Sequence, residues 1–241
     1  MRCRGGRARG YPSRVSHTPL PDRTFAAFLF DMDGTILSSI AAAERVWAAW
    51  ARRHGIAVER FLPTIHGRQA VETVRDLGIP GLDPEAEGAE ILAREMEDVG
   101  GIAPIADAPR FLASLPPQRW AIVTSAPREL ALRRLAAAGL PPSRVMVTAE
   151  EVRHGKPAPD AYLLAARKFA VAAGDCLVFE DAPAGIASAE AAGAAVVVVT
   201  AVHRHPMVTP HPAVRDFEGL AAHSDESGRI RLLGLQMRGQ A

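Results

Sequence analysis

Residues 25–36 read FAAFLFDMDGTI, in which six apolar residues run directly into two carboxylates that are one residue apart. The apolar run does not alternate with polar residues, so it predicts a strand buried on both faces, as in a parallel sheet. Asp31 and Asp33 then stand at the carboxyl end of that strand, where open α/β sheets bind their ligands. The stretch therefore predicts a fold class and the place of a site.

Further apolar runs of the same kind occur later in the chain. They are RWAIVTS (119–125), CLVFED (176–181), AAVVVVT (194–200) and the shorter RVMVTAE (144–150). Helical patterns at 127–138, 158–170 and 184–192 lie between or after them. This alternation of strand and helix predicts a doubly wound, Rossmann-like α/β sheet.

Residues 39–102 interrupt the alternation with helical patterns and no evident strand. These patterns are SIAAAERVWAAWARRHG (39–55), GRQAVETVRDLG (67–78) and PEAEGAEILAREMEDVG (84–100). The first ends on Gly55, a candidate C-cap. We therefore expect a core formed by 24–38 and 103–235, an all-helical cap at 39–102, and a disordered basic extension at 1–23. GRIRLL (228–233) is a candidate edge strand.

The composition of the 241 residues is that of an ordinary globular protein, with 48% apolar residues, 23% charged residues and a formal net charge of +1. It gives no argument for nucleic acid or a membrane as partner. The apolar-rich run 191–202 is too short to span a bilayer, and the N-terminus lacks the apolar stretch of a secretory signal. Two cysteines, Cys3 and Cys176, make no disulfide framework and suit a reducing cytoplasm. We expect a cytoplasmic monomer.

Polar pairs follow three of the apolar runs. They are Asp31 with Asp33, Thr124 with Ser125, and Glu180 with Asp181. Since parallel strands end at the same edge, the pairs should meet in one crevice. Two unit charges about 4 Å apart cost roughly 4 kcal/mol at an effective dielectric near 20, so four carboxylates there need a cation. Oxygen ligands favour Mg²⁺, and Lys156, one of only two lysines, can add another positive charge.

The close pair Asp31 and Asp33 suggests two chemical roles. One carboxylate can attack phosphorus and form an aspartyl-phosphate. The other can protonate the leaving alkoxide and then deprotonate water. Gly34 allows a tight turn beside a phosphate, whose oxygens Thr124 and Ser125 can hold.

Four motifs, FLFDMDGT (28–35), VTSA (123–126), GKPAPDAY (155–162) and VFEDAPAGI (178–186), occur in the order and spacing of the haloacid dehalogenase-like hydrolases. The chain resembles their sugar-phosphatase branch, near the β-phosphoglucomutase-like proteins, over about residues 24–235. The stretches AERVWAAWARRHG (43–55) and HGRQA (66–70) are similar to the cap of that branch.

The resemblance implies functional residues and a cofactor. It implies Asp31 as nucleophile and Asp33 as general acid/base. Its phosphate-binding residues are Thr124 and Lys156, to which we add Ser125 as a candidate from its place beside Thr124. Its Mg²⁺ ligands are Asp31, the Asp33 carbonyl and Asp181, with Glu180 nearby. It also implies that the cap closes over the site and excludes water. The sequence departs from the common DGTLxDS pattern at Ser38, where an acidic residue is usual.

Each of these residues also has a purely structural interpretation. The Asp pair could form a turn, Thr124 or Ser125 could cap a helix, Lys156 could be a solvated loop charge, and Glu180 could be a structural carboxylate. In the cap, His66, Gly67 and Arg68 are candidate substrate contacts. His66 could instead be structural and Arg68 solvated; Glu44 is a weaker candidate.

Other cap and loop residues are expected to be structural. Trp47 and Trp50 should pack between the cap helices. His203, His205 and His211 follow no zinc spacing, which favours a surface loop.

The leading hypothesis is a Mg²⁺-dependent phosphatase acting on a small phosphorylated sugar or polyol. The alternative is a sugar phosphomutase, which needs a basic cap residue for a second phosphate. Residues 39–102 contain no lysine, and Ala70 stands where the mutase pattern has arginine, although Arg68 could substitute. The presence of Asp33 disfavours a dehalogenase, and the full set of carboxylates disfavours a non-enzymatic scaffold. The absence of a P-loop sequence disfavours a P-loop kinase.

Overall fold

The computed structural model describes residues 19–205 and 207–234. The disorder predicted for residues 1–23 falls mostly outside this part of the chain. At the centre is a parallel six-stranded sheet in the order β6-β5-β2-β7-β8-β9. Its strands are β6 (Val145–Val147), β5 (Trp120–Val123), β2 (Ala27–Phe30), β7 (Cys176–Glu180), β8 (Ala195–Val199) and β9 (Ala213–Val214). The doubly wound α/β prediction is confirmed.

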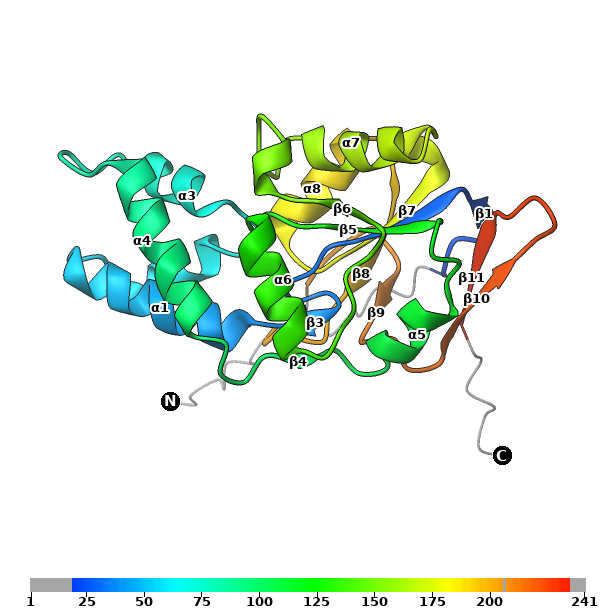
Figure 1. Ribbon diagram of the computed structural model, residues 1–241, viewed down its shortest axis with the longest axis horizontal. Helices are drawn as coiled ribbons and strands as arrows, with labels where there is room; N and C mark the ends of the chain where they lie inside the picture. The colour runs from blue at the N-terminus through cyan, green and yellow to red at the C-terminus, as the bar shows by residue number, and fades with distance from the viewer. Residues whose placement is uncertain (1–18, 206, 235–241) are drawn as a thin grey trace, which may run out of the picture.

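Helices cover both faces of this sheet, which explains the uninterrupted apolar runs (Figure 1). One face carries α7 (Asp160–Lys168) and α8 (Pro183–Ala191), and the other carries α5 (Ala108–Ser114) and α6 (Arg128–Ala137). Short 3₁₀ turns occupy Ala149–Glu151 and Ala173–Asp175. In β2 the side chains alternate between the two layers, with Phe30 stacked on Phe179 at 4.6 Å between ring centroids. Two buried layers thus hold the central strand in register.

The cap is an all-helical insertion with its own apolar core. It comprises α1 (Ile40–Arg53), α2 (Val58–Phe61), a 3₁₀ turn (Leu62–Thr64), α3 (Ala70–Asp76) and α4 (Pro84–Glu97). Trp47 and Trp50 pack on Phe61, with 5.6 and 5.8 Å between the ring centroids, as predicted. Two short antiparallel strands, β3 (Leu37–Ser38) and β4 (Ala103–Pro104), form both connections to the core. Figure 1 shows the cap at the end of the molecule next to α6.

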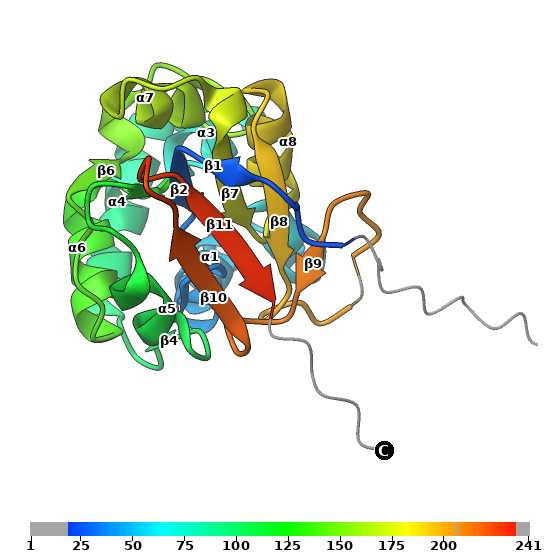
Figure 2. The same ribbon diagram turned by 90° about the vertical axis from the view of Figure 1, so that its right-hand side faces the viewer.

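A small antiparallel sheet lies at the other end of the molecule from the cap (Figure 2). Its order is β1 (Thr24–Phe25), β11 (Ile230–Gly234) and β10 (Leu220–Ser224). The strand predicted at 228–233 is present, but its prediction as an edge strand was wrong, because it is the middle strand of this sheet. The sequence LAAHS of β10 has too few apolar residues to reveal its partner. Among the described residues, no helix has the length and apolar character needed to cross a membrane.

Candidate active site

The carboxyl end of the central sheet gathers three acidic side chains. Asp31 directly follows β2, Glu180 ends β7 and Asp181 follows it. One carboxylate oxygen from each of the three lies within 4.8 Å of the others. All three side chains are buried, so their charges interact strongly.

Lys156 is the buried cation of this cluster, with a relative exposure of 1%. Its Nζ donates to Asp31 Oδ1 at 2.6 Å, to Glu180 Oε1 at 2.8 Å and to the Val123 carbonyl at 3.1 Å. Burial alone would lower the pKa of the ammonium group, but the two carboxylates outweigh it and raise the pKa well above its usual value. All three N–H donors are used by the protein, so a bond from Lys156 to phosphate requires one of them to be exchanged.

The Glu180 carboxylate is fully occupied by hydrogen bonds. Oε1 accepts from Lys156 and from Tyr162 Oη at 3.0 Å, and Oε2 accepts from the backbone N–H groups of Asp181 and Ala182 at 2.8 and 3.0 Å. This arrangement fixes the turn that leads from β7 into α8. It favours a structural role for Glu180.

The acidic cluster holds more negative charge than Lys156 can balance. Burial, opposed by Lys156 and reinforced by Glu180, raises the pKa of Asp31 to about 7. Burial and the neighbouring carboxylates also raise the pKa of Asp181 well above its usual value, although Thr35 Oγ1 donates to it at 3.2 Å. Buried carboxylates that resist ionisation are the oxygen ligands that a hard divalent cation stabilises. The residues present fit such an ion.

Gly34 allows the turn after Asp33 to pass directly over the cluster. Its φ angle is +93°, and a Cβ there would lie 2.1 Å from Asp181 Oδ2. No side chain fits this space, and the backbone conformation also favours glycine.

Asp33 turns away from the acidic cluster and towards the cap. Its carboxylate accepts a hydrogen bond from Ser39 Oγ at 2.5 Å and pairs with Arg134 Nη1 at 3.1 Å. Arg134 Nη2 also pairs with Glu95 Oε1 of the cap at 3.1 Å. Ser38, the sequence departure, pairs with Ala103 between β3 and β4 and is half-buried.

Sequence reasoning missed Arg134 and Glu95, although both carry a recognisable signal. Arg134 lies on the buried face of α6 together with Leu130 and Leu135. Glu95 lies on the buried face of α4 with Ile91. A charged residue at an apolar position of an amphipathic helix needs a buried partner.

The two residues after β5 are already engaged within the protein. Thr124 Oγ1 accepts from the Ala126 N–H at 3.1 Å, and Ser125 Oγ donates to the Gly67 carbonyl of the cap at 2.9 Å. Neither caps α6, whose N-cap residue is Pro127. The helix-capping interpretation was therefore wrong, and Ser125 instead ties the cap to the core.

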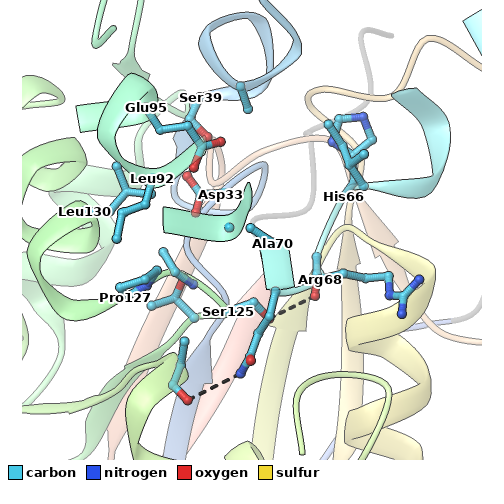
Figure 3. Close-up of a pocket in the computed structure, with 18 of the residues that line it drawn as sticks. Asp33, Ser39, His66, Arg68, Ala70, Leu92, Glu95, Ser125, Pro127 and Leu130 are labelled. Carbon is cyan, nitrogen blue, oxygen red and sulfur yellow. Dashed lines mark hydrogen bonds between the residues drawn. The ribbon is translucent and has the colours of Figure 1, made fainter. Parts of the chain in front are cut away.

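A cavity of about 340 Å³ lies between cap and core. Asp31, Asp33, Thr124 and Ser125 line its core side. Figure 3 shows Asp33, Ser39 and Glu95 together on one side, with His66 and Arg68 across from them. The catalytic pair expected from the sequence therefore lies on the core side of this cavity.

The cap residues predicted to touch substrate lie along this cavity. His66 Nε2 lies 3.5 Å from Glu44 Oε1. Burial lowers the pKa of the His66 imidazole, and the Glu44 carboxylate partly opposes this shift. Arg68 pairs with Asp76 at 2.5 Å, and its guanidinium points away from Asp33 (Figure 3). Gly67, with φ +74°, closely approaches the core, since a Cβ there would lie 2.8 Å from the Cβ of Ala182.

The three histidines of the loop after β8 do not converge. His203 Nε2 lies 2.8 Å from the Asp181 carbonyl oxygen, and His211 Nε2 lies 2.6 Å from Glu190 Oε1. Over residues 19–205 and 207–234, the one group with metal-ligand geometry is the acidic cluster, without any of these histidines. The surface-loop interpretation needs one correction, since His203 contacts the backbone beside the cluster.

Comparison with known proteins adds an independent line of observation. The family model described as haloacid dehalogenase-like hydrolase matches residues 25–193. Hexitol phosphatase A of Escherichia coli is 46% identical over 178 residues, covering 72% of this chain and 82% of that protein. Validoxylamine A 7'-phosphate phosphatase of Streptomyces hygroscopicus is 35% identical over 182 residues, covering 73% and 85%.

Solved structures share the fold. A hydrolase from Pseudomonas syringae matches with a TM-score of 0.63 and 25% identity, over 73% of this chain and 84% of that one. CbbY from Rhodobacter sphaeroides, in a complex with xylulose-(1,5)bisphosphate, matches with a TM-score of 0.66 and 23% identity, over 80% and 95%. The fold and the sequence relatives thus agree.

Proposed function

The chain belongs to the haloacid dehalogenase-like hydrolases and is a phosphoric monoester hydrolase, and from this premise we propose that it hydrolyses phosphate esters of small sugars or polyols through an aspartyl-phosphate. One observation carries the proposal. Asp31 and Asp33 are two residues apart but have separate surroundings: Asp31 is held by Lys156 in the buried acidic cluster, and Asp33 faces the cavity.

In the proposed reaction the two carboxylates divide the work. An Asp31 oxygen attacks phosphorus, and Asp33 donates a proton to the leaving alcohol oxygen as its bond to phosphorus breaks. Asp33 then takes a proton from water as that water attacks the aspartyl-phosphate, which releases inorganic phosphate and restores Asp31. Thr124, Ser125 and Lys156 would bind phosphoryl oxygens, and closure of the cap would exclude bulk water.

We propose Mg²⁺ as the cofactor, held by Asp31, the Asp33 carbonyl and Asp181, with Glu180 orienting the turn. When bound, the ion would offset the combined negative charge of carboxylates and phosphate. We also propose that the enzyme is a cytoplasmic monomer with a core at 24–38 and 103–235 and a cap at 39–102. His66, Gly67 and Arg68 would contact the substrate.

The mutase alternative is not favoured by the cap. A mutase must hold a second phosphate there, and the cap cation nearest to that role, Arg68, is paired with Asp76 and points away from Asp33. The test incubates hexitol and hexose monophosphates with the protein and Mg²⁺. Stoichiometric release of inorganic phosphate supports the phosphatase; isomerisation that depends on a sugar bisphosphate primer would replace it with the mutase.

Removal of divalent metal is expected to stop phosphate release and to lower the melting temperature, more at pH 8 than at pH 5.5. Burial raises the pKa of Asp31 to about 7, above its unfolded value near 4. Such a carboxyl stabilises the folded state while it is protonated, and this contribution is lost as the pH rises through 7. The metal therefore has more repulsion to offset at pH 8.

Thermal unfolding with EDTA or with saturating Mg²⁺ measures this effect at both pH values. The expected result is a larger Mg²⁺-induced rise in melting temperature at pH 8. An equal rise at both pH values would contradict the assignment of the ion to the acidic cluster.

A further inference from the structure

A buried ion pair crosses the boundary between cap and core at the catalytic end of the cavity. Arg134 comes from α6 of the core and Glu95 from α4 of the cap, and their side chains are only 7% and 10% exposed. Both residues line the cavity. Burying two charged groups at this place is costly unless each is compensated, so the pair requires an explanation.

The pair is directly connected to the proposed acid/base. One guanidinium nitrogen of Arg134 pairs with Asp33 Oδ2 and another with Glu95 Oε1, both at 3.1 Å. The single guanidinium group of Arg134 therefore bridges the carboxylates of Glu95 and Asp33. Since the leaving oxygen must lie within hydrogen-bond reach of Asp33, the next carbon of the leaving group and its substituent come close to Glu95 and Arg134.

The surroundings decide which substituent fits. Leu92 and Leu130 supply apolar walls to the same cavity, and the indole N–H of Trp47 donates a hydrogen bond to Glu95. Arg134 balances the charge of Glu95 while Asp33 holds the proton that it donates to the leaving oxygen. Burial raises the pKa of Glu95, Arg134 opposes this and Asp33 reinforces it. A hydroxyl can donate to the Glu95 carboxylate and accept from the Arg134 guanidinium. A carboxylate at the same place has no hydrogen to donate to Glu95, and its charge would face the Glu95 carboxylate while Arg134 is already paired with Glu95 and Asp33.

We propose that Glu95 and Arg134 form a hydroxyl-recognition pair, which selects leaving groups with a hydroxyl on the carbon next to the ester carbon and rejects those with a carboxylate there. This inference rests on the proposed phosphatase function and narrows its substrates to neutral polyols and sugars. Glu95 is thus a specificity-determining residue, and Arg134 also positions Asp33.

The test uses three phosphate esters that differ only in the group next to the ester carbon: 2-hydroxyethyl phosphate (CH₂OH), ethyl phosphate (CH₃) and 2-phosphoglycolate (COO⁻). Hydrogen bonds to charged groups contribute about 1.5–3 kcal/mol, which corresponds to about 10- to 100-fold in kcat/KM. The wild-type enzyme should therefore prefer the hydroxyethyl ester over the ethyl ester by about 10-fold. The wild-type enzyme should prefer the hydroxyethyl ester over 2-phosphoglycolate by at least about 100-fold.

Glu95→Gln keeps the shape of the side chain and removes its charge. The ratio of kcat/KM for the hydroxyethyl ester to that for phosphoglycolate should fall at least about 10-fold. A ratio within one variant does not depend on the folded fraction, so misfolding cannot produce this change. Glu97→Gln is the matched control, because Glu97 ends the same helix, pairs with Arg94, is 71% exposed and lies outside the lining of this cavity; its ratio should equal that of the wild type.

Three outcomes would overturn the inference. A wild-type enzyme that shows no preference for the hydroxyethyl ester over the ethyl ester lacks hydroxyl recognition. A Glu95→Gln variant that slows all three esters by the same factor makes Glu95 structural, while the phosphatase proposal stands. If the wild-type enzyme with Mg²⁺ releases phosphate from none of these esters and from no hexitol phosphate, the proposed function fails and the inference fails with it.

Discussion

Asp31→Asn is expected to lower phosphate release from p-nitrophenyl phosphate by at least about 10⁴-fold. The amide cannot form an acyl phosphate, although it has the same shape and its oxygen can still accept the hydrogen bond from Lys156. Its position directly after β2 is held by the Asp31 N–H, which donates to the Phe179 carbonyl at 3.0 Å. The loss should therefore come from chemistry and not from misplacement.

The stability of the same variant provides the control. Because burial raises the pKa of Asp31 to about 7, its ionised form destabilises the folded state at pH 8 when metal is removed. The asparagine removes that charge, so the melting temperature in EDTA at pH 8 should be no lower than that of the wild type. More than about 1% residual activity in a folded Asp31→Asn protein would refute the nucleophile assignment.

Lys156→Met is expected to lower the free energy of unfolding by about 3–5 kcal/mol and to remove phosphatase activity. The substitution leaves Asp31 and Glu180 buried without their cation and the Val123 carbonyl without a donor. Methionine has a similar length, so a cavity is a minor contribution. Since domains are typically stable by only about 5–15 kcal/mol, the loss is a large part of the total.

Chemical denaturation measures this change, and the other lysine is its matched control. Lys168 donates to the Met146 carbonyl and pairs with Glu151, but its side chain is 31% exposed. Lys168→Met should therefore cost no more than about 1 kcal/mol and leave activity near the wild-type value. Similar losses in the two variants would show that Lys156 is not the charge that balances the buried carboxylates.

Much of the fold can be predicted from the sequence because the central strands are buried on both faces. β2, β5, β7 and β8 appear as uninterrupted apolar runs, and helical spacing identifies the cap. β10 could not be predicted in this way, since only Leu220 of its LAAHS sequence is buried in the core and the strand is otherwise held by pairing with β11. Without β10, the sequence could not predict that β11 is the middle strand of its sheet.

In the site, too, residues placed by the ends of strands could be predicted, and contacts between distant side chains could not. Asp31 and Asp181 are close because of where their strands end, which the chain order already indicates. The direction of the Asp33 side chain depends on Arg134, which lies 101 positions later in the sequence, and on Glu95 of the cap. No local sequence pattern predicts such a long-range ion pair. A charged residue on the buried face of a helix indicates only that it has an oppositely charged or polar partner.

The strand order also has a consequence for how the protein is made on the ribosome. β2 emerges early, but its neighbours β5 and β7 begin only at Trp120 and Cys176, so this apolar strand stays unpaired until they are synthesised. The helical insert, whose contacts are local, emerges in the interval and can form its own core first. We therefore expect the apolar segment 25–30 to stay exposed during translation, and pausing before residue 180 should favour aggregation.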